Sequence, residues 1–146
     1  MNHLIFFLFV LVLSFLFAKL EIEIEGENGW ALKLPTWRKK FQSKLLRFIW
    51  GQKELTGYHL YLFSFIFTIL HAVFLFVPWS LQIESKIIAL FILVAILEDF
   101  AWFVLNPAFG IKKFQKEFIP WHQLWFVGLP VEYWIYGTLA MVLYFL

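Results

Sequence analysis

Four apolar stretches constrain what this chain can fold into more than any other feature of its sequence. They cover about residues 2–20, 58–78, 87–105 and 124–146. A helix needs about 20 residues to cross a hydrocarbon layer of roughly 30 Å, and each stretch is close to that length. The sequence therefore predicts an all-α membrane protein, a four-transmembrane-helix bundle that forms a single domain over residues 1–146.

The composition excludes a water-soluble globular protein. Of the 146 residues, 62% are hydrophobic and 23% aromatic, and only 15% are charged, against about 25% in an ordinary soluble domain. The absence of cysteine excludes disulfides, thiolate metal sites and iron–sulfur clusters. A net charge of +2 is too small to indicate nucleic acid as a partner. The expected surroundings are a lipid bilayer.

The first stretch differs from a cleaved signal peptide. It has no basic residue ahead of its apolar run and no small-x-small cleavage site before Lys19. We therefore expect it to remain as a membrane anchor. Polar residues interrupt the other three stretches, so we expect these three to face one another.

Basic residues predict how the bundle lies in the membrane. Eleven of the twelve lie between the first and second stretches or between the third and fourth: Lys19, Lys33, Arg38, Lys39, Lys40, Lys44, Arg47, Lys53, Lys112, Lys113 and Lys116. Only Lys86 lies on the opposite side. Because basic residues in short loops resist translocation, we expect both termini outside and both long loops in the cytoplasm.

Period-two alternation follows the first stretch. Residues 20–34 read LEIEIEGENGWALKL, with apolar and charged side chains alternating on both sides of a Gly-Glu-Asn-Gly turn signal. In this register Ile24 opposes Trp30 and Glu21 opposes Lys33, which pairs apolar with apolar and acid with base. We predict a small cytoplasmic β-hairpin.

Residues 36–50 have the pattern of a basic amphipathic helix that lies on the membrane surface. Thr36 is a candidate N-cap, and the apolar residues share one helical face. The predicted membrane-surface residues are Trp37, Arg38, Lys39, Lys40, Phe41, Lys44 and Arg47. This helix either only anchors the fold or also recruits an anionic lipid.

Three carboxylates lie where a membrane protein rarely carries charge. Glu98 and Asp99 are inside the third stretch and Glu132 is inside the fourth, and an acidic residue at a helix centre is disfavoured by roughly 2.5–3.5 kcal/mol. A rise of 1.5 Å per residue places all three roughly 10–12 Å from the cytoplasmic end. They are the candidate catalytic residues, and their alternative role is a network that joins helices.

Two histidines, His59 and His122, enter the bundle at the same boundary. With Glu98, Asp99 and Glu132 they form a candidate metal site, because mixed carboxylate and imidazole ligands suit iron, manganese or zinc. Neither HExxH nor Glu-x-x-His occurs, so the spacing identifies no known metal motif. The alternative role of each histidine is a hydrogen bond to backbone or lipid headgroups.

Four further side chains share helical faces with these carboxylates. They are Trp102, Asn106, Trp125 and Tyr136. We predict that they bind an apolar substrate, a lipid or an isoprenoid. The alternative for the tryptophans is an interfacial belt.

The fourth stretch contains Pro130. This proline either kinks the last helix or lies at its first turn. The second arrangement leaves only about 17 residues, a marginal crossing. It also places Glu132 in the favourable field of a helix N-terminus.

The C-terminal part of the chain contains an acidic residue, then Trp-Phe, Pro and Gly, and then Gly-x-Pro-x-Glu at the start of a last helix. This pattern resembles that of the small membrane lycopene cyclases. The residues that carry the resemblance are Asp99, Trp102, Phe103, Pro107, Gly110, Gly128, Pro130 and Glu132. That family has a doubled acidic residue where this chain reads Glu132-Tyr133, and a wider spacing between its Asp and Trp. The resemblance implies acid catalysis on an isoprenoid chain, with Glu132 and Asp99 as candidates for proton transfer.

Three functions are consistent with these features. The first is a membrane-embedded enzyme that acts on a lipid or isoprenoid, by proton transfer or through a divalent metal. The second is a non-catalytic subunit or assembly factor, whose polar residues specify packing against a partner membrane protein. The third is a proton- or ion-coupled conduit, which so few helices form only as a homo-oligomer.

Overall fold

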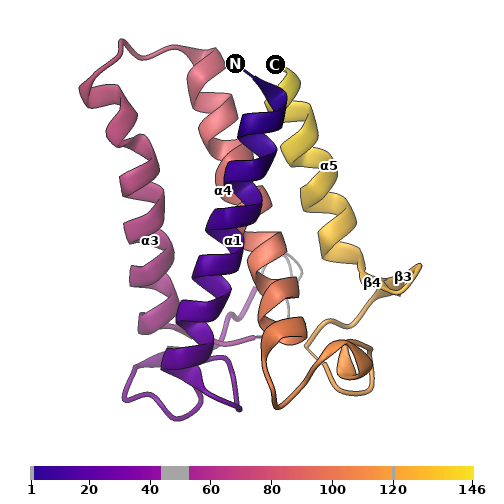
Figure 1. Ribbon diagram of the computed structural model, residues 1–146. Helices are drawn as coiled ribbons and strands as arrows, with labels where there is room; N and C mark the ends of the chain where they lie inside the picture. The colour runs from indigo at the N-terminus through magenta and orange to yellow at the C-terminus, as the bar shows by residue number, and fades with distance from the viewer. Residues whose placement is uncertain (1, 44–52, 120) are drawn as a thin grey trace.

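A helical bundle with two small antiparallel sheets makes up the fold (Figure 1). The computed structural model describes residues 2–43, 53–119 and 121–146. The four α-helices within these residues are α1 (His3–Glu25), α3 (Gly57–His71), α4 (Leu81–Leu105) and α5 (Val131–Phe145). Two 3-10 turns, η1 (Ala72–Leu75) and η2 (Ile111–Lys113), extend α3 and follow α4.

Three helical segments are long and apolar enough to cross a membrane. They are His3–Glu25, Gly57–Leu75 and Leu81–Leu105, with 23, 19 and 25 residues. At 1.5 Å per residue they are about 29–38 Å long, which matches a hydrocarbon layer of roughly 30 Å. The first three predicted spans are therefore confirmed as helices of the expected length and composition.

The fourth predicted span is shorter than the sequence indicated. Its apolar stretch begins with an antiparallel pair, β3 (Trp125–Phe126) and β4 (Leu129–Pro130), and α5 has 15 residues. Val127 and Gly128 form the turn between the two strands, both at positive φ. Pro130 immediately precedes the helix, so it begins the last helix and does not kink it. At about 22 Å, α5 is short for a crossing.

α4 is the element to which the other helices attach. α1 and α5 pack along it (Figure 1), and Val10, Phe17, Val94 and Ala140 belong to the apolar core that these three helices form. α3 contacts α4 at fewer positions. Among the contacts between α3 and the other helices are pairs of phenylalanine rings, such as Phe63 with Phe91 at a centroid distance of 6.1 Å.

The two ends of the bundle differ in character. Both chain termini lie at one end (Figure 1), where His3 Nδ1 and the Tyr144 hydroxyl are 2.5 Å apart. The long segments that follow α1 and α4 lie at the other end (Figure 1). A second apolar cluster packs there, formed by Ala18, Ile22, Trp102, Phe103, Phe114 and Ile119.

The predicted β-hairpin over residues 20–34 is wrong. α1 continues to Glu25 and ends at Gly26, whose φ of 69° closes the helix, and residues 27–34 form turns. The alternation that indicated strands also satisfies a helix, because Glu21, Ile22 and Glu25 fall on one helical face. Extending an existing helix needs no new nucleus, so these residues continue α1 instead of forming a strand.

The predicted amphipathic helix over residues 36–50 does not begin where the pattern placed it. Arg38–Lys39 form strand β1, which pairs antiparallel with β2 (Leu55–Thr56). The Arg38 guanidinium donates hydrogen bonds to the carbonyls of Trp30 and Ala31, which fixes the extended backbone there. Trp37, Lys39 and Lys40 are exposed and Phe41 is half-buried. Residues 44–50, with Lys44 and Arg47, lie outside the described residues.

Gly29 lies at a close approach that allows no side chain. Its φ is 61°, and a Cβ placed on it would lie 2.6 Å from Cη2 of Trp102. Gly128, in the turn between β3 and β4, has a similar φ of 75° but open space around it. A comparison of alanine substitutions at these two glycines therefore separates the cost of the backbone conformation from the cost of the close packing.

We predict that Gly29→Ala destabilises the protein more than Gly128→Ala. Both variants place alanine in the left-handed region, which costs about 1–2 kcal/mol. Gly29→Ala also forces Trp102 to shift, which adds roughly 1–3 kcal/mol. Chemical denaturation in detergent micelles measures both free energies of unfolding. Equal losses in the two variants would contradict the tight packing of Gly29 on Trp102.

Candidate functional site

A cavity of about 220 Å³ lies at the end of the bundle opposite the termini. Residues from all four helices and from both long segments line it. Its titratable lining residues, tyrosines aside, are Glu21, Glu25, Lys53, His59, Glu98, Asp99, His122 and Glu132. So many charged groups in one enclosure need partners or a bound cation.

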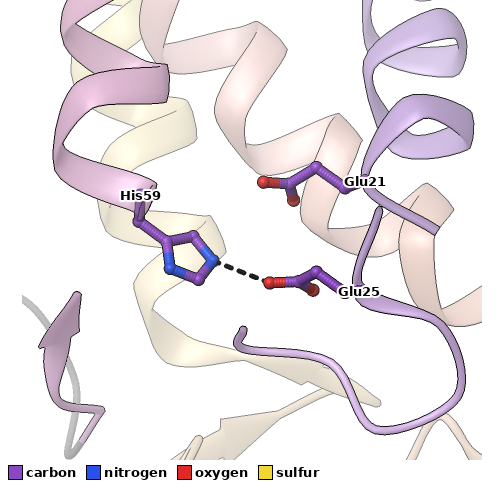
Figure 2. Close-up of side chains that lie close together, drawn as sticks. All are labelled: Glu21, Glu25 and His59. Atoms are coloured by element: carbon purple, nitrogen blue, oxygen red, sulfur yellow. Dashed lines mark ion pairs between the residues drawn. The ribbon is translucent and has the colours of Figure 1, made fainter. Parts of the chain in front are cut away.

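Glu21, Glu25 and His59 form the first group of side chains in this cavity. Glu21 and Glu25 lie in the last two turns of α1, and His59 lies in the first turn of α3. One ligand atom from each residue lies within 4.8 Å of the others, and Figure 2 shows the side chains converging. All three are buried, with exposed fractions of 5%, 6% and 2%. This carboxylate and imidazole group has the donor set of a metal site.

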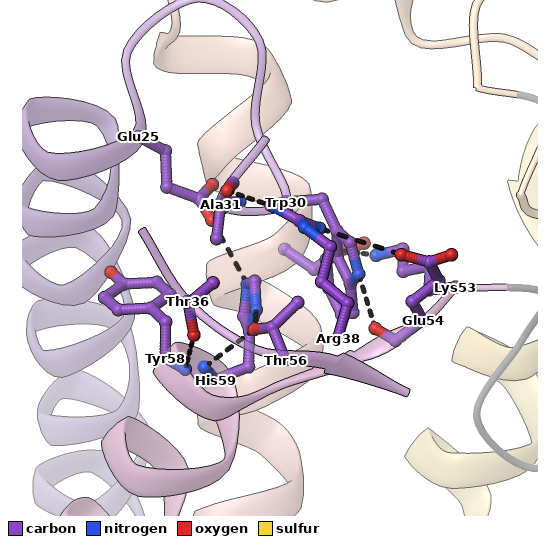
Figure 3. Close-up of polar contacts among 11 residues, drawn as sticks. Glu25, Trp30, Ala31, Thr36, Arg38, Lys53, Glu54, Thr56, Tyr58 and His59 are labelled. Atoms are coloured by element: carbon purple, nitrogen blue, oxygen red, sulfur yellow. Dashed lines mark hydrogen bonds and ion pairs between the residues drawn. The ribbon is translucent and has the colours of Figure 1, made fainter. Parts of the chain in front are cut away.

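The helix cap of α3 orients His59. The Thr56 hydroxyl oxygen accepts a hydrogen bond from the His59 backbone N–H at 3.1 Å and lies 2.6 Å from ring Nδ1 (Figure 3). The other ring nitrogen, Nε2, faces Glu25 Oε1 at 3.2 Å. When Nδ1–H donates to Thr56, Nε2 presents a lone pair toward the carboxylates, as a metal-ligating histidine requires.

The segment after α1 holds Glu25 and covers the cavity. The Ala31 N–H donates to Glu25 Oε1 at 2.6 Å, and the Trp30 ring stacks on His59 at a centroid distance of 4.0 Å. Trp30 Nε1 in turn donates to the Glu54 carbonyl at 2.7 Å (Figure 3). These contacts fix the carboxylate and the imidazole from outside the helices, which preorganises the group.

Glu21 and Glu98 form a buried carboxyl pair in the cavity. Both side chains are at least nine-tenths buried, and the two carboxyl groups hydrogen-bond each other, which requires a proton on one of them. Oε1 of each residue has no donor with hydrogen-bond geometry among the described residues. Because both residues line the cavity, a cation there would be an alternative to the shared proton.

Asp99, His122 and Glu132 form the second group, with Lys53 and Tyr133. Asp99 Oδ2 lies 3.3 Å from His122 Nε2 and accepts from the Tyr133 hydroxyl at 2.5 Å, while Oδ1 accepts from Lys53 Nζ at 3.2 Å. His122 Nδ1 lies 3.8 Å from Glu132 Oε2. The two carboxylates therefore contact opposite nitrogens of one imidazole ring.

Lys53 connects the second group to the first. Its ammonium lies 4.0 Å from the centroid of the Trp30 ring and 5.6 Å from that of Trp121. Cations over tryptophan faces are attracted by the ring quadrupole. Since Trp30 also stacks on His59, one indole ring separates the lysine from the imidazole of the first group.

Burial and the neighbouring charges shift the pKa of His122 in opposite directions. Burial lowers its pKa, but the hydrogen bond to Asp99 and the nearby carboxylates of Asp99 and Glu132 outweigh this effect and raise the pKa above its ordinary value. Lys53 opposes the rise because it is also cationic. The protonated ring is thus the form that the neighbouring carboxylates favour.

The structure brings all five predicted metal ligands to this cavity but divides them. His59 lies with Glu21 and Glu25, whereas Asp99, His122 and Glu132 form the other group, and the Glu98 carboxyl group lies beside that of Glu21. Among the predicted catalytic residues, Glu98, Asp99 and Glu132 therefore all line one enclosure. Their chemical roles stay predictions.

The predicted substrate-binding residues also divide. Trp102 and Tyr136 line the cavity. Asn106 instead caps α4 and donates from Nδ2 to the Gly26 carbonyl at 3.0 Å. Trp125 donates from Nε1 to the His122 carbonyl at 2.7 Å, which helps to position that histidine.

Sequence reasoning missed two carboxylates of the first group. Glu21 and Glu25 were assigned to the wrong hairpin, and their spacing of four residues at the end of an apolar run is the signal that places both on one helical face. Lys53 and Tyr133 were also missed. Neither has a local pattern that indicates a contact with Asp99, which lies 46 residues from Lys53 and 34 from Tyr133.

Comparison with known proteins does not identify this site. No protein-family model, curated protein or solved structure matches the chain. What the site does is therefore inferred from its own residues.

We predict that His122 makes the stability of the protein depend on pH. Because its pKa is raised in the folded state, protonated His122 stabilises the fold below its unfolded pKa, and this stabilisation is lost as pH rises through the folded pKa. His122→Gln removes this component. Denaturation in micelles over a pH series tests it, and identical slopes for the variant and the parent would refute it.

Proposed function

We propose that this protein is a membrane-embedded enzyme that acts on a lipid or isoprenoid at a metal-assisted acidic site. The ligands are Glu21, Glu25 and His59, and the metal is iron, manganese or zinc. The observation that carries the proposal is the convergence of these three donors within 4.8 Å inside a cavity. Three protein ligands that leave a position open are typical of catalytic metal sites, whereas structural sites are closed.

The charge balance of the cavity supports a bound cation. Glu21, Glu25, Glu98, Asp99 and Glu132 line it. Lys53 is the one lysine in the described lining. A divalent ion between Glu21 and Glu25 would offset the repulsion of two acids that share one helical face. It would also replace the proton that Glu21 shares with Glu98 as the partner of the Glu21 carboxylate.

The walls of the cavity support an apolar substrate. Aromatic rings make up much of the lining: Trp30, Phe63, Trp102, Phe103, Trp121, Tyr133 and Tyr136. Phe63 and Tyr136 lie one turn beyond His59 and Glu132, deeper along their helices. The cavity therefore has an aromatic wall deeper than its charged groups, which suits an amphiphile whose polar group reacts.

The same arrangement supports our proposed orientation in the membrane. The segments that carry most basic residues, such as Arg38 and Lys113, lie at the cavity end (Figure 1), and Lys86 is near the other end. By the positive-inside rule we propose that the cavity end faces the cytoplasm and that both termini lie outside.

A non-catalytic role has one observation in its favour. Asp99 is contacted by Lys53, His122 and Tyr133, which come from three separate parts of the chain. Such a network can serve only to hold segments together. Under this second candidate function the protein is a membrane subunit or assembly factor, and the first group binds no metal.

Elemental analysis of the detergent-purified protein distinguishes the two. We expect about one iron, manganese or zinc per chain in the parent, and at least tenfold less in Glu25→Gln and His59→Ala, because each removes a ligand. The matched control is Glu23→Gln, an exposed acid on the same helix, which should retain the metal. Co-purified lipids, identified by mass spectrometry, then direct the substrate search.

A parent protein without metal after supplementation with each of the three ions would refute the metal site. Equal metal content in Glu25→Gln and Glu23→Gln would also refute it, since the ion would then lie elsewhere. Either result would favour the non-catalytic role.

A further inference from the structure

We infer that His122 and Asp99 form an acid–base dyad, in which Asp99 positions the ring and His122 Nδ1 exchanges a proton with a hydroxyl group bound between His122 and Glu132. The hydroxyl belongs to an alcohol or to water. The inference deepens the proposed function by assigning the proton-transfer group of the same cavity. The arrangement of the dyad can be tested without the metal.

Asp99 fixes which nitrogen of His122 carries the proton. Oδ1 accepts from Lys53 and Oδ2 accepts from the Tyr133 hydroxyl, so the carboxylate serves as an acceptor on both oxygens. His122 Nε2 faces that same Oδ2 at 3.3 Å. The proton of the neutral ring is therefore on Nε2, and the lone pair is on Nδ1.

The free nitrogen faces a gap that suits an oxygen atom. His122 Nδ1 and Glu132 Oε2 are 3.8 Å apart, which is too long for a direct hydrogen bond. Glu132 Oε2 is buried and has no hydrogen-bond partner in the described chain. Both side chains line the cavity. One oxygen atom can lie within hydrogen-bond distance of both groups.

An alcohol hydroxyl can bind at this pair in either protonation state of the ring. When His122 is neutral, an alcohol donates its single proton to Nδ1, whereas water donates one proton to Nδ1 and the other to Glu132 Oε2. When His122 is protonated, the hydroxyl accepts from Nδ1–H and donates to the Glu132 carboxylate. A ketone or an ether lacks the proton needed for either arrangement. The geometry therefore points to a hydroxyl and not to a carbonyl ligand.

The proton step balances without a further reactant. The hydroxyl O–H bond breaks, its electron pair stays on the oxygen, and a new N–H bond forms at Nδ1 of His122. The resulting imidazolium lies between the carboxylates of Asp99 and Glu132, which stabilise its charge. The reverse step returns the proton to an oxygen leaving group.

Nitrogen-15 NMR of histidine-labelled protein in nanodiscs tests the dyad. At alkaline pH, where the ring is neutral, we expect the Nε2–H tautomer for His122, identified by the loss of its signals in His122→Gln. Asp99→Asn should convert the ring to the Nδ1–H tautomer. The reason is that the Asn carbonyl must face Lys53, which turns its amide NH₂ toward Nε2.

Two matched variants distinguish an effect of Asp99 on the His122 tautomer from a general disruption of the site. Tyr133→Phe removes one donor to Asp99 and Glu132→Gln removes the second carboxylate, but neither touches the bond between Asp99 and Nε2. Both should therefore keep the Nε2–H tautomer. If Asp99→Asn does not fold, the parent spectrum alone still decides, because an Nδ1–H tautomer there would overturn the dyad.

Adding farnesol to the nanodiscs identifies the source of the hydroxyl. A change in the Nδ1 signal of the parent, reduced in Glu132→Gln, supports an alcohol; an unchanged signal that already shows a hydrogen-bonded Nδ1 supports water. An Nδ1 without any hydrogen bond in both samples would overturn the hydroxyl site. Metal content should stay at the parent level in Asp99→Asn, so failure of the dyad and failure of the metal site are distinguishable.

Discussion

Five carboxyl groups enclosed at one end of an apolar bundle are the constraint on which the rest of the structure depends. Desolvating an ionised carboxylate is expensive, so each group needs a proton, a donor or a cation close by. Lys53, Tyr133 and His122 supply donors to Asp99. Asp99 is thus satisfied by protein groups, whereas the group formed by Glu21, Glu25 and His59 and the gap between His122 and Glu132 each have room for a ligand.

The segments outside the helices do much of the positioning. Trp30 lies between His59 and Lys53 and donates to the Glu54 carbonyl, while Arg38 binds the carbonyls around it. The two short strands that join residues 38–39 to residues 55–56 hold this segment at the start of α3. The site is therefore built by loops fixed onto helix ends, which suits chemistry at a membrane boundary better than chemistry at its centre.

Hydropathy predicted α1 and α4 because long apolar runs have few alternatives to a helix. It missed the start of α5 because the pair formed by residues 125–130 is as apolar as the helix that follows. Glu21 and Glu25 were assigned to strands because apolar and charged residues that alternate over only a few positions fit a strand and one face of a helix equally well. The depth of Glu98, Asp99 and Glu132 was predictable from helical rise, but their contacts with Lys53 and Tyr133 depend on tertiary packing that leaves no local pattern.

The position of Glu21 and Glu25 on the first helix has a consequence for biogenesis. A chain is synthesised from its N-terminus, so α1 leaves the ribosome before His59, the residue that completes its group. Until then these two acids lack the imidazole that completes the group, and an unpaired carboxylate is best kept hydrated. Burial of the acids therefore waits for α3 to arrive, which makes the final packing of the C-terminal end of α1 a late event in assembly.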